Sequence, residues 1–111
     1  MKIYHNPRCS KSRQTLALLQ ENHVTCEVIE YLKNPPSRDE LADIVAKLGL
    51  RPKDLVRVKD AELQEIQLDL ENDEAVLQAL ARYPSLLQRP IVVTEEQAVI
   101  GRPPENVLNI L

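Results

Sequence analysis

One cysteine lies where a thiol becomes reactive. Cys9 comes just after an Asn6-Pro7 turn signal, and a helix is predicted to begin at Cys9 or Ser10. The free N–H groups at a helix N-terminus stabilise a thiolate and bind anions. Nearby cations add to this effect: Arg8, Lys11 and Arg13. We predict a nucleophilic thiolate with a pKa below the free-thiol value of about 8.5; the alternative is a buried, inert cysteine with incidental basic neighbours.

The second cysteine is predicted to pack in the core. Cys26 lies in a predicted strand, residues 24–31, in which side chains alternate between two faces. Ser12 stands where a dithiol motif would carry its second cysteine, so Cys9 has no disulfide partner within its own helix turn. Cys26 could pair with Cys9 only if their Cα atoms came within about 7 Å, which we do not expect.

We predict no metal site. A Cys2His2 set would need four residues: His5, Cys9, His23 and Cys26. Zinc ligands usually come in turn-borne pairs with tight geometry. His23 and Cys26 lie at a strand entrance, where alternation directs them to opposite faces.

The elements around Cys9 form two units of regular structure with a helical block between them. Residues 2–5, the helix at Cys9 and residues 24–31 give a β-α-β unit. Residues 90–94 and 98–101 are apolar runs separated by a polar turn, which predicts a β-hairpin. Two prolines then open a last helix, for which we predict three buried residues: Val107, Leu108 and Leu111.

The intervening block carries clear helix signals. Ser37 and Glu40 have the spacing of a capping box, and Gly49 lies where a left-handed C-cap belongs. Apolar residues follow at helical spacing: Leu41, Ile44, Val45 and Leu48. Further helices are predicted at Pro52, over residues 61–66 and over residues 73–82.

This order predicts an α/β fold of the thioredoxin-like type. A βαβ unit followed by a ββα unit would form a four-stranded mixed sheet, with a helical insertion at about residues 37–88 between strands 2 and 3. We take residues 1–111 as a single domain. In such folds a cis proline precedes the third strand, and Pro90 occupies that place. The loop holding Arg89 would then face Cys9, and an arginine fork suits tetrahedral oxyanions.

Charge and hydropathy exclude several classes of protein. The formal net charge is −3, which disfavours a nucleic-acid binder, yet residues 1–20 hold four cations and no acid. No apolar run approaches the roughly 20 residues that span a bilayer, and the N-terminus lacks the apolar core of a signal peptide. We therefore expect a cytoplasmic protein with reduced thiols, no membrane or nucleic-acid partner, and a monomeric state.

Four separate segments resemble one family. They are IYHNPRCSKSRQTL (residues 3–16), YLKNPPSRDEL (31–41), RPIVVT (89–94) and GRPP (101–104). Together they are similar to the ArsC family of glutaredoxin-linked arsenate reductases, and most closely to its YfgD-like branch.

The resemblance implies a function and a set of site residues. The nucleophilic cysteine of the family matches Cys9, and its three oxyanion-binding arginines match Arg57, Arg89 and Arg102. The histidine before its active loop matches His5, and the serine after its cysteine matches Ser12. The implied thiolate attacks arsenate, glutathione as co-substrate completes the reduction to arsenite, and glutaredoxin recycles the enzyme, with no bound cofactor.

Two alternatives accompany this prediction. Characterised arsenate reductases of the family typically carry Gly-Thr after the cysteine, where this chain has Ser10 and Lys11. Leu63 replaces a tyrosine that is common there. These differences suggest a related glutathione-linked thiol oxidoreductase with another substrate. The family also includes Spx-type regulators that sense oxidation through a CxxC pair, against which Ser12 argues.

Overall fold

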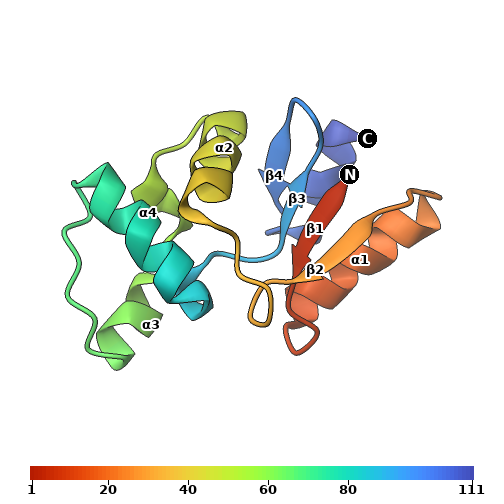
Figure 1. Ribbon diagram of the computed structural model, residues 1–111. Helices are drawn as coiled ribbons and strands as arrows, with labels where there is room; N and C mark the ends of the chain where they lie inside the picture. The colour runs from red at the N-terminus through yellow and green to blue at the C-terminus, as the bar shows by residue number, and fades with distance from the viewer. The chain divides into compact units, whose positions relative to one another are not determined.

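The computed structural model describes residues 1–111 and divides them into two compact units. The first comprises residues 1–34 and 89–111, and the second comprises residues 35–88 (Figure 1). The second unit coincides closely with the predicted helical insertion. That the whole chain acts as a single domain stays a prediction.

A four-stranded mixed sheet forms the centre of the first unit. Its strands are β1 (Lys2–His5), β2 (Glu27–Glu30), β3 (Ile91–Val93) and β4 (Ala98–Ile100). The spatial order is β2-β1-β3-β4; β2 is parallel to β1, and the other two pairs are antiparallel. This confirms the predicted thioredoxin-like sheet and its C-terminal hairpin.

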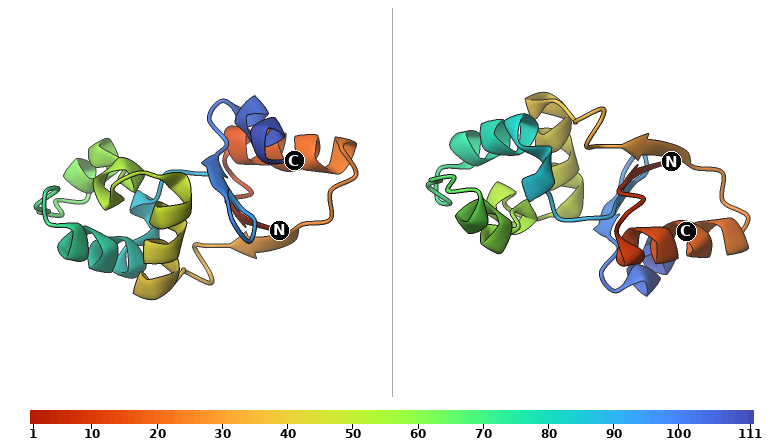
Figure 2. Two further views of the ribbon diagram at one scale, coloured as in Figure 1. Left: turned by 90° about the horizontal axis from the view of Figure 1, so that it is seen from above. Right: turned by 90° about the horizontal axis from the view of Figure 1, so that it is seen from below.

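Helix α1 (Ser10–Glu21) and the 3-10 helix η3 (Pro104–Ile110) lie side by side on one face of this sheet (Figure 2). Their apolar side chains close the core, whose fully buried members are Ile3, Leu19, Val92 and Val107. Burial of aliphatic side chains is the main stabilising contribution here, since the sequence has no Phe or Trp. The same packing holds the N-terminus of α1 at the end of β1.

The prediction for the last helix was wrong at two of its three residues. Val107 is fully buried, but Leu108 and Leu111 are exposed. The segment is a 3-10 helix with three residues per turn, so residues three apart form one row along it. Pro104 and Val107 are therefore buried in one row, and Leu108 and Leu111 form another that faces solvent.

Strand β2 is shorter than the predicted strand over residues 24–31. Its partner β1 offers only four residues, Lys2 to His5, and the ladder stops where β1 stops. Val24 does not pair with β1; its N–H donates instead to the carbonyl of Leu19, in the last turn of α1. A strand can extend no further than the neighbour that satisfies its hydrogen bonds.

The second unit is helical. It contains α2 (Arg38–Leu48), the 3-10 helix η1 (Pro52–Leu55), α3 (Val58–Leu63), α4 (Asp73–Arg82) and the 3-10 helix η2 (Pro84–Leu86). The capping box of Ser37 with Glu40 is present, and Gly49 adopts the left-handed conformation with φ 67°. These two local predictions are confirmed.

Helix α3 begins and ends three residues earlier than predicted. The carbonyl of Arg57 accepts hydrogen bonds from the N–H groups of Asp60 and Ala61, which starts the helix at Val58. Glu65 has a positive φ of 55°, which ends the helix before it. Arg57 is consequently the N-cap residue of α3.

Replacing Gly101 with alanine should destabilise the first unit by about 1–3 kcal/mol, as overpacking does. A Cβ there would lie 2.5 Å from Thr15 Oγ1 and 2.8 Å from Pro90 Cγ, so α1 and β4 would have to separate. Urea denaturation measures the loss. Adding Thr15→Ala should recover part of the lost stability, because it removes the side-chain atoms that the new Cβ would meet. If the stability losses of the two substitutions simply add, the steric explanation is wrong.

Candidate active site

Cys9 is the N-cap residue of α1 and is only partly buried. Its backbone is extended, its N–H donates to the carbonyl of Asn6, and its own carbonyl accepts from the N–H of Arg13. The first turn of α1 contains no acidic residue. The thiol therefore sits at the uncompensated positive end of a helix.

Two of the three predicted arginines converge on this thiol. Arg102 Nη2 lies 3.7 Å from Cys9 Sγ, and Arg102 Nε donates to the backbone carbonyl of Arg89 at 2.8 Å. Arg89 lies beside the same sulfur, as the thioredoxin arrangement predicts. The peptide bond from Arg89 to Pro90 is cis, which confirms that prediction, and the bond from Arg102 to Pro103 is cis as well.

The surroundings of Cys9 favour its ionised form. Burial by itself would raise the pKa of the Cys9 thiol. Hydrogen bonds from the backbone N–H groups of Ser12 and Lys11 and from the Arg89 side chain, together with the charge of Arg89, outweigh burial and lower the pKa overall. A helix N-terminus and an arginine together thus hold the sulfur as a nucleophile.

Alkylation of the two thiols should separate along the pH scale. The rate follows the thiolate fraction, so it rises with pH through each pKa. The Cys9 midpoint should lie below about 8.5. Burial raises the pKa of Cys26, so that thiol should react only at higher pH. Mass spectrometry of each cysteine over a pH series measures both midpoints, and a Cys9 midpoint equal to that of Cys26 would contradict the activation of Cys9.

His5 and Ser12 support the loop rather than touch the sulfur. His5 Nδ1 and Ser12 Oγ lie 2.6 Å apart, both residues are buried, and Ser12 Oγ accepts from the N–H of Asn6 at 3.0 Å. Burial lowers the pKa of His5, so its imidazole is neutral near pH 7. This network joins the end of β1 to the first turn of α1 and so orients the N–H groups that face Cys9.

The sheet register explains how the site is assembled. His5 pairs with Glu30, Tyr4 with Ile91, and Ile91 with Ile100. Extending each pairing to the end of β1 and one residue beyond gives a single row across the four strands: Tyr31, Asn6, Arg89 and Arg102. Residues paired across neighbouring strands face the same side, so these side chains gather at one edge of the sheet.

Tyr31 and Asn6 are members of this row that the sequence analysis missed as site residues. The available signal was that both follow directly on the two parallel strands, whose carboxyl ends meet at one edge of a sheet. Asn6 shapes the loop, because its Oδ1 accepts from the N–H of Arg8 at 3.0 Å.

Two further residues that the sequence analysis considered are Arg57, predicted to bind the oxyanion, and Cys26, not expected to pair with Cys9. Arg57 belongs to the helical unit, where it forms a partly buried ion pair with Asp60. Cys26 lies one residue before β2, at the end of the sheet opposite the Cys9 loop. Four residues of strand at about 3.3 Å each exceed the 7 Å reach of a disulfide, so Cys26 does not resolve Cys9 in this arrangement.

A hollow of about 220 Å³ adjoins the Cys9 loop within the first unit. Its lining includes Arg8, Glu30, Leu32 and Lys33, with Lys33 Nζ 3.7 Å from Glu30 Oε1. The hollow thus offers charges of both signs within reach of the nucleophile's loop.

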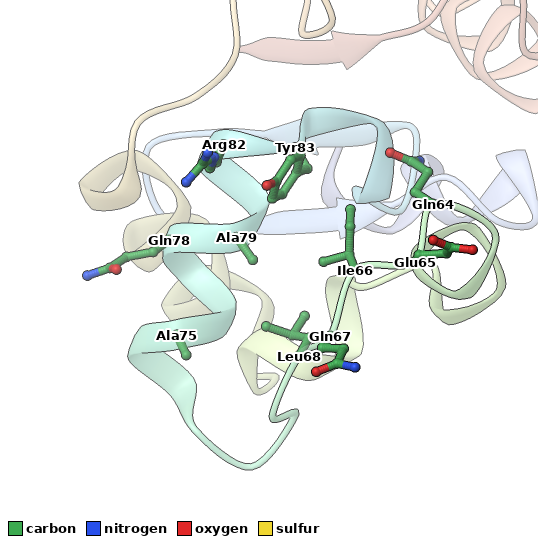
Figure 3. Close-up of a pocket in the computed structure, with 10 residues that line it drawn as sticks. All are labelled: Gln64, Glu65, Ile66, Gln67, Leu68, Ala75, Gln78, Ala79, Arg82 and Tyr83. Carbon is green, nitrogen blue, oxygen red and sulfur yellow. The ribbon is translucent and has the colours of Figure 1, made fainter.

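A second hollow, of about 610 Å³, lies in the helical unit between residues 64–68 and one side of α4 (Figure 3). Arg82, which lies over the ring of Tyr83, and Glu65 provide its charged groups. It contains no cysteine or histidine, so it lacks a nucleophile of the kind found at Cys9.

Two further features bear on the sequence predictions. No three His, Cys, Asp or Glu side chains are grouped closely enough to ligate a metal ion. None of the helices combines the length and the apolar character needed to span a bilayer.

Comparisons with known proteins agree on one family. The ArsC family profile matches residues 4–110. A protein of Neisseria meningitidis serogroup A named arsenate reductase is 50% identical over 115 residues, which cover 100% of this chain and 97% of the relative. The protein YfgD of Escherichia coli K12 is 47% identical over 114 residues, covering 100% and 96%.

Solved structures extend this similarity to the fold. The structure of an arsenate reductase from Vibrio cholerae has a TM-score of 0.85 and 45% identity, with coverage of 100% of this chain and 98% of that one. An arsenate reductase structure described as putative, from Yersinia pestis, also has a TM-score of 0.85, at 46% identity and 97% coverage of both chains.

Proposed function

The chain belongs to the ArsC family, and from that premise we propose that it is an arsenate reductase that uses the Cys9 thiolate as its nucleophile. The observation that carries the proposal is the thiolate at the N-terminus of α1 with Arg89 and Arg102 beside it. A tetrahedral oxyanion needs several aligned donors, and guanidinium forks and helix N–H groups supply them.

The first step is attack of the Cys9 thiolate on arsenic. A sulfur–arsenic bond forms and one oxygen leaves as water after protonation, so arsenic remains As(V). Arg89 and Arg102 neutralise the negative charge of the anion, which would otherwise repel a thiolate. The N–H groups of the first α1 turn are positioned to hold an oxygen of the adduct.

Reduction then requires an external thiol, for which we propose glutathione. Attack of the glutathione thiolate on Cys9 Sγ breaks the sulfur–arsenic bond and leaves its electron pair on arsenic, which becomes As(III). Cys9 is left in a mixed disulfide with glutathione. A glutaredoxin thiol takes up the glutathionyl group and restores Cys9. This scheme needs one protein thiol, which fits the position of Cys26 at the far end of the sheet.

The hollow beside the Cys9 loop supports the choice of glutathione. Glutathione carries two carboxylates and one ammonium group. Arg8 and Lys33 present positive charge to such carboxylates, and Glu30 presents negative charge to the ammonium group. We place the reaction in the reducing cytoplasm, where glutathione and free thiols coexist, and with the chain acting as a monomer.

Turnover of the purified protein tests the proposal. With arsenate, glutathione and glutaredoxin present, arsenite formation and NADPH oxidation coupled through glutathione reductase should appear together. Omitting glutathione or glutaredoxin in turn should stop steady turnover. A folded protein that forms no arsenite, or that turns over another oxyanion much faster, would contradict the proposal and favour a related thiol oxidoreductase with a different substrate.

A further inference from the structure

Two buried donor groups beside Cys9 have no hydrogen-bond partner. Tyr31 is fully buried, and its hydroxyl meets no partner at hydrogen-bonding geometry. Arg89 Nε is buried and unpaired as well. Leaving a buried donor unsatisfied typically costs about 1–3 kcal/mol, so such groups are rare in native proteins and call for an explanation.

The surroundings explain why the protein leaves both donors unpaired. Tyr31 and Arg89 flank Asn6 in the row at the edge of the sheet. The Asn6 side chain acts on the Tyr31 hydroxyl as a donor, and its Oδ1 accepts from the N–H of Arg8. On the other side, Arg102 is held by the carbonyl of Arg89 and directed to Cys9 Sγ. Arg89 and Asn6 both approach the Tyr31 hydroxyl as donors, so the acceptor for its proton is left to a ligand.

The Tyr31 hydroxyl keeps its proton at neutral pH. Burial raises the pKa of the phenol most strongly and outweighs the lowering by the charge of Arg89 and by the Arg89 and Asn6 side chains that approach the hydroxyl as donors; the negative charge of Cys9 adds the smallest contribution, which raises the pKa. Arg89 stays cationic, because the Cys9 thiolate and Tyr31 offset the effect of burial on its pKa. The pair thus offers one neutral O–H and one cationic N–H close to Cys9.

We propose that the Tyr31 hydroxyl and Arg89 Nε are a paired binding element for the oxyanion held at Cys9, each donating a hydrogen bond to one of its oxygens. This inference rests on the proposed function and adds Tyr31 to the residues that contact the substrate. A tetrahedral anion supplies the acceptors that the row lacks. The neutral phenol adds affinity and orientation without a further charge at the site.

Tyr31→Phe tests the assignment, because it removes only the hydroxyl. Binding of phosphate, an unreactive tetrahedral anion, is measured by calorimetry, and arsenate turnover by kcat/KM. Anion affinity should fall about tenfold, as expected for loss of one hydrogen bond to a charged group. The melting temperature without anion should stay equal or rise, since an unsatisfied buried hydroxyl has been removed. Tyr83→Phe, in the helical unit, is the matched control and should change neither the affinity for phosphate nor kcat/KM for arsenate.

The outcomes separate the two proposals. Unchanged anion affinity in Tyr31→Phe, with binding intact in the wild type, overturns the Tyr31 assignment alone. Absence of oxyanion binding in the wild type overturns the proposed function together with this inference. A lower melting temperature with unchanged affinity assigns the hydroxyl to the fold.

A measurement on the unmodified chain covers the case in which the variant does not fold. The sequence has three tyrosines, so selective ¹³Cζ labelling gives three resolvable signals. Titration with phosphate should shift the Tyr31 signal, because ring carbons bonded to a hydroxyl respond to its hydrogen bonding. The Tyr83 signal should stay constant, and a stationary Tyr31 signal under saturating phosphate would overturn the assignment.

Discussion

Replacing Cys9 with serine should reduce arsenate turnover by about 1,000-fold or more. The hydroxyl has nearly the same shape as the thiol, but it does not ionise near neutral pH and is a poor nucleophile without a general base. His5 does not serve as that base, because its Nδ1 is hydrogen-bonded to Ser12 Oγ. Arsenite formation under the full coupled assay measures the loss.

The chain supplies its own control for this substitution. Cys26→Ser makes the same atomic change at the opposite end of the sheet and should leave turnover within about twofold of the wild type. Cys9→Ser should unfold at nearly the wild-type urea concentration, since its backbone bonds to Asn6 and Arg13 do not involve the sulfur. Retained turnover in a folded Cys9→Ser protein would remove Cys9 from the mechanism.

Replacing Arg89 with alanine should lower kcat/KM for arsenate by about 100- to 1,000-fold. The guanidinium stabilises the thiolate and is also placed to bind the anion, and each charge-assisted hydrogen bond contributes about 1.5–3 kcal/mol. Loss of the charge also removes one cause of the low Cys9 pKa. The rise of activity with pH, which follows the thiolate, should therefore move to higher pH. Kinetics at a series of pH values measure both effects.

Two further arginine variants test this role of Arg89. Arg89→Lys keeps the charge but loses the planar fork, so it should recover the pH profile more fully than the affinity for arsenate. Arg82→Ala removes an exposed cation of α4 and should change neither. A large fall in stability at unchanged arsenate KM and unchanged pH profile would assign Arg89 to the fold instead.

Arg57, the third arginine that the family resemblance assigns to oxyanion binding, can be tested by the same kind of substitution. It forms an ion pair with Asp60 at the start of α3. If Arg57 also binds the oxyanion, Arg57→Ala should raise the arsenate KM while the melting temperature stays nearly constant. An unchanged KM would limit its role to the α3 ion pair.

Local sequence patterns determined most of the secondary structure. A capping box depends only on residues three apart, and a left-handed C-cap depends on one glycine, so Ser37, Glu40 and Gly49 were readable directly. The same holds for the hairpin of β3 and β4, and for the start of α1 at Cys9. Cys9 could be identified as a candidate nucleophile from its neighbours in the chain, because a helix N-terminus and adjacent cations are local features, and the family resemblance then favoured it over an inert cysteine.

Only the tertiary structure decided the features that depend on partners far apart in sequence. The length of β2 was set by β1, and the 3-10 geometry of η3 exposed Leu108 and Leu111 against expectation. Arg89 and Arg102 reach Cys9, and Tyr31 remains without a hydrogen-bond partner, because the sheet register aligns residues from all four strands. Hydrogen-bond satisfaction is a property of the folded neighbourhood, so a donor left without an acceptor cannot be recognised until every neighbour has been placed.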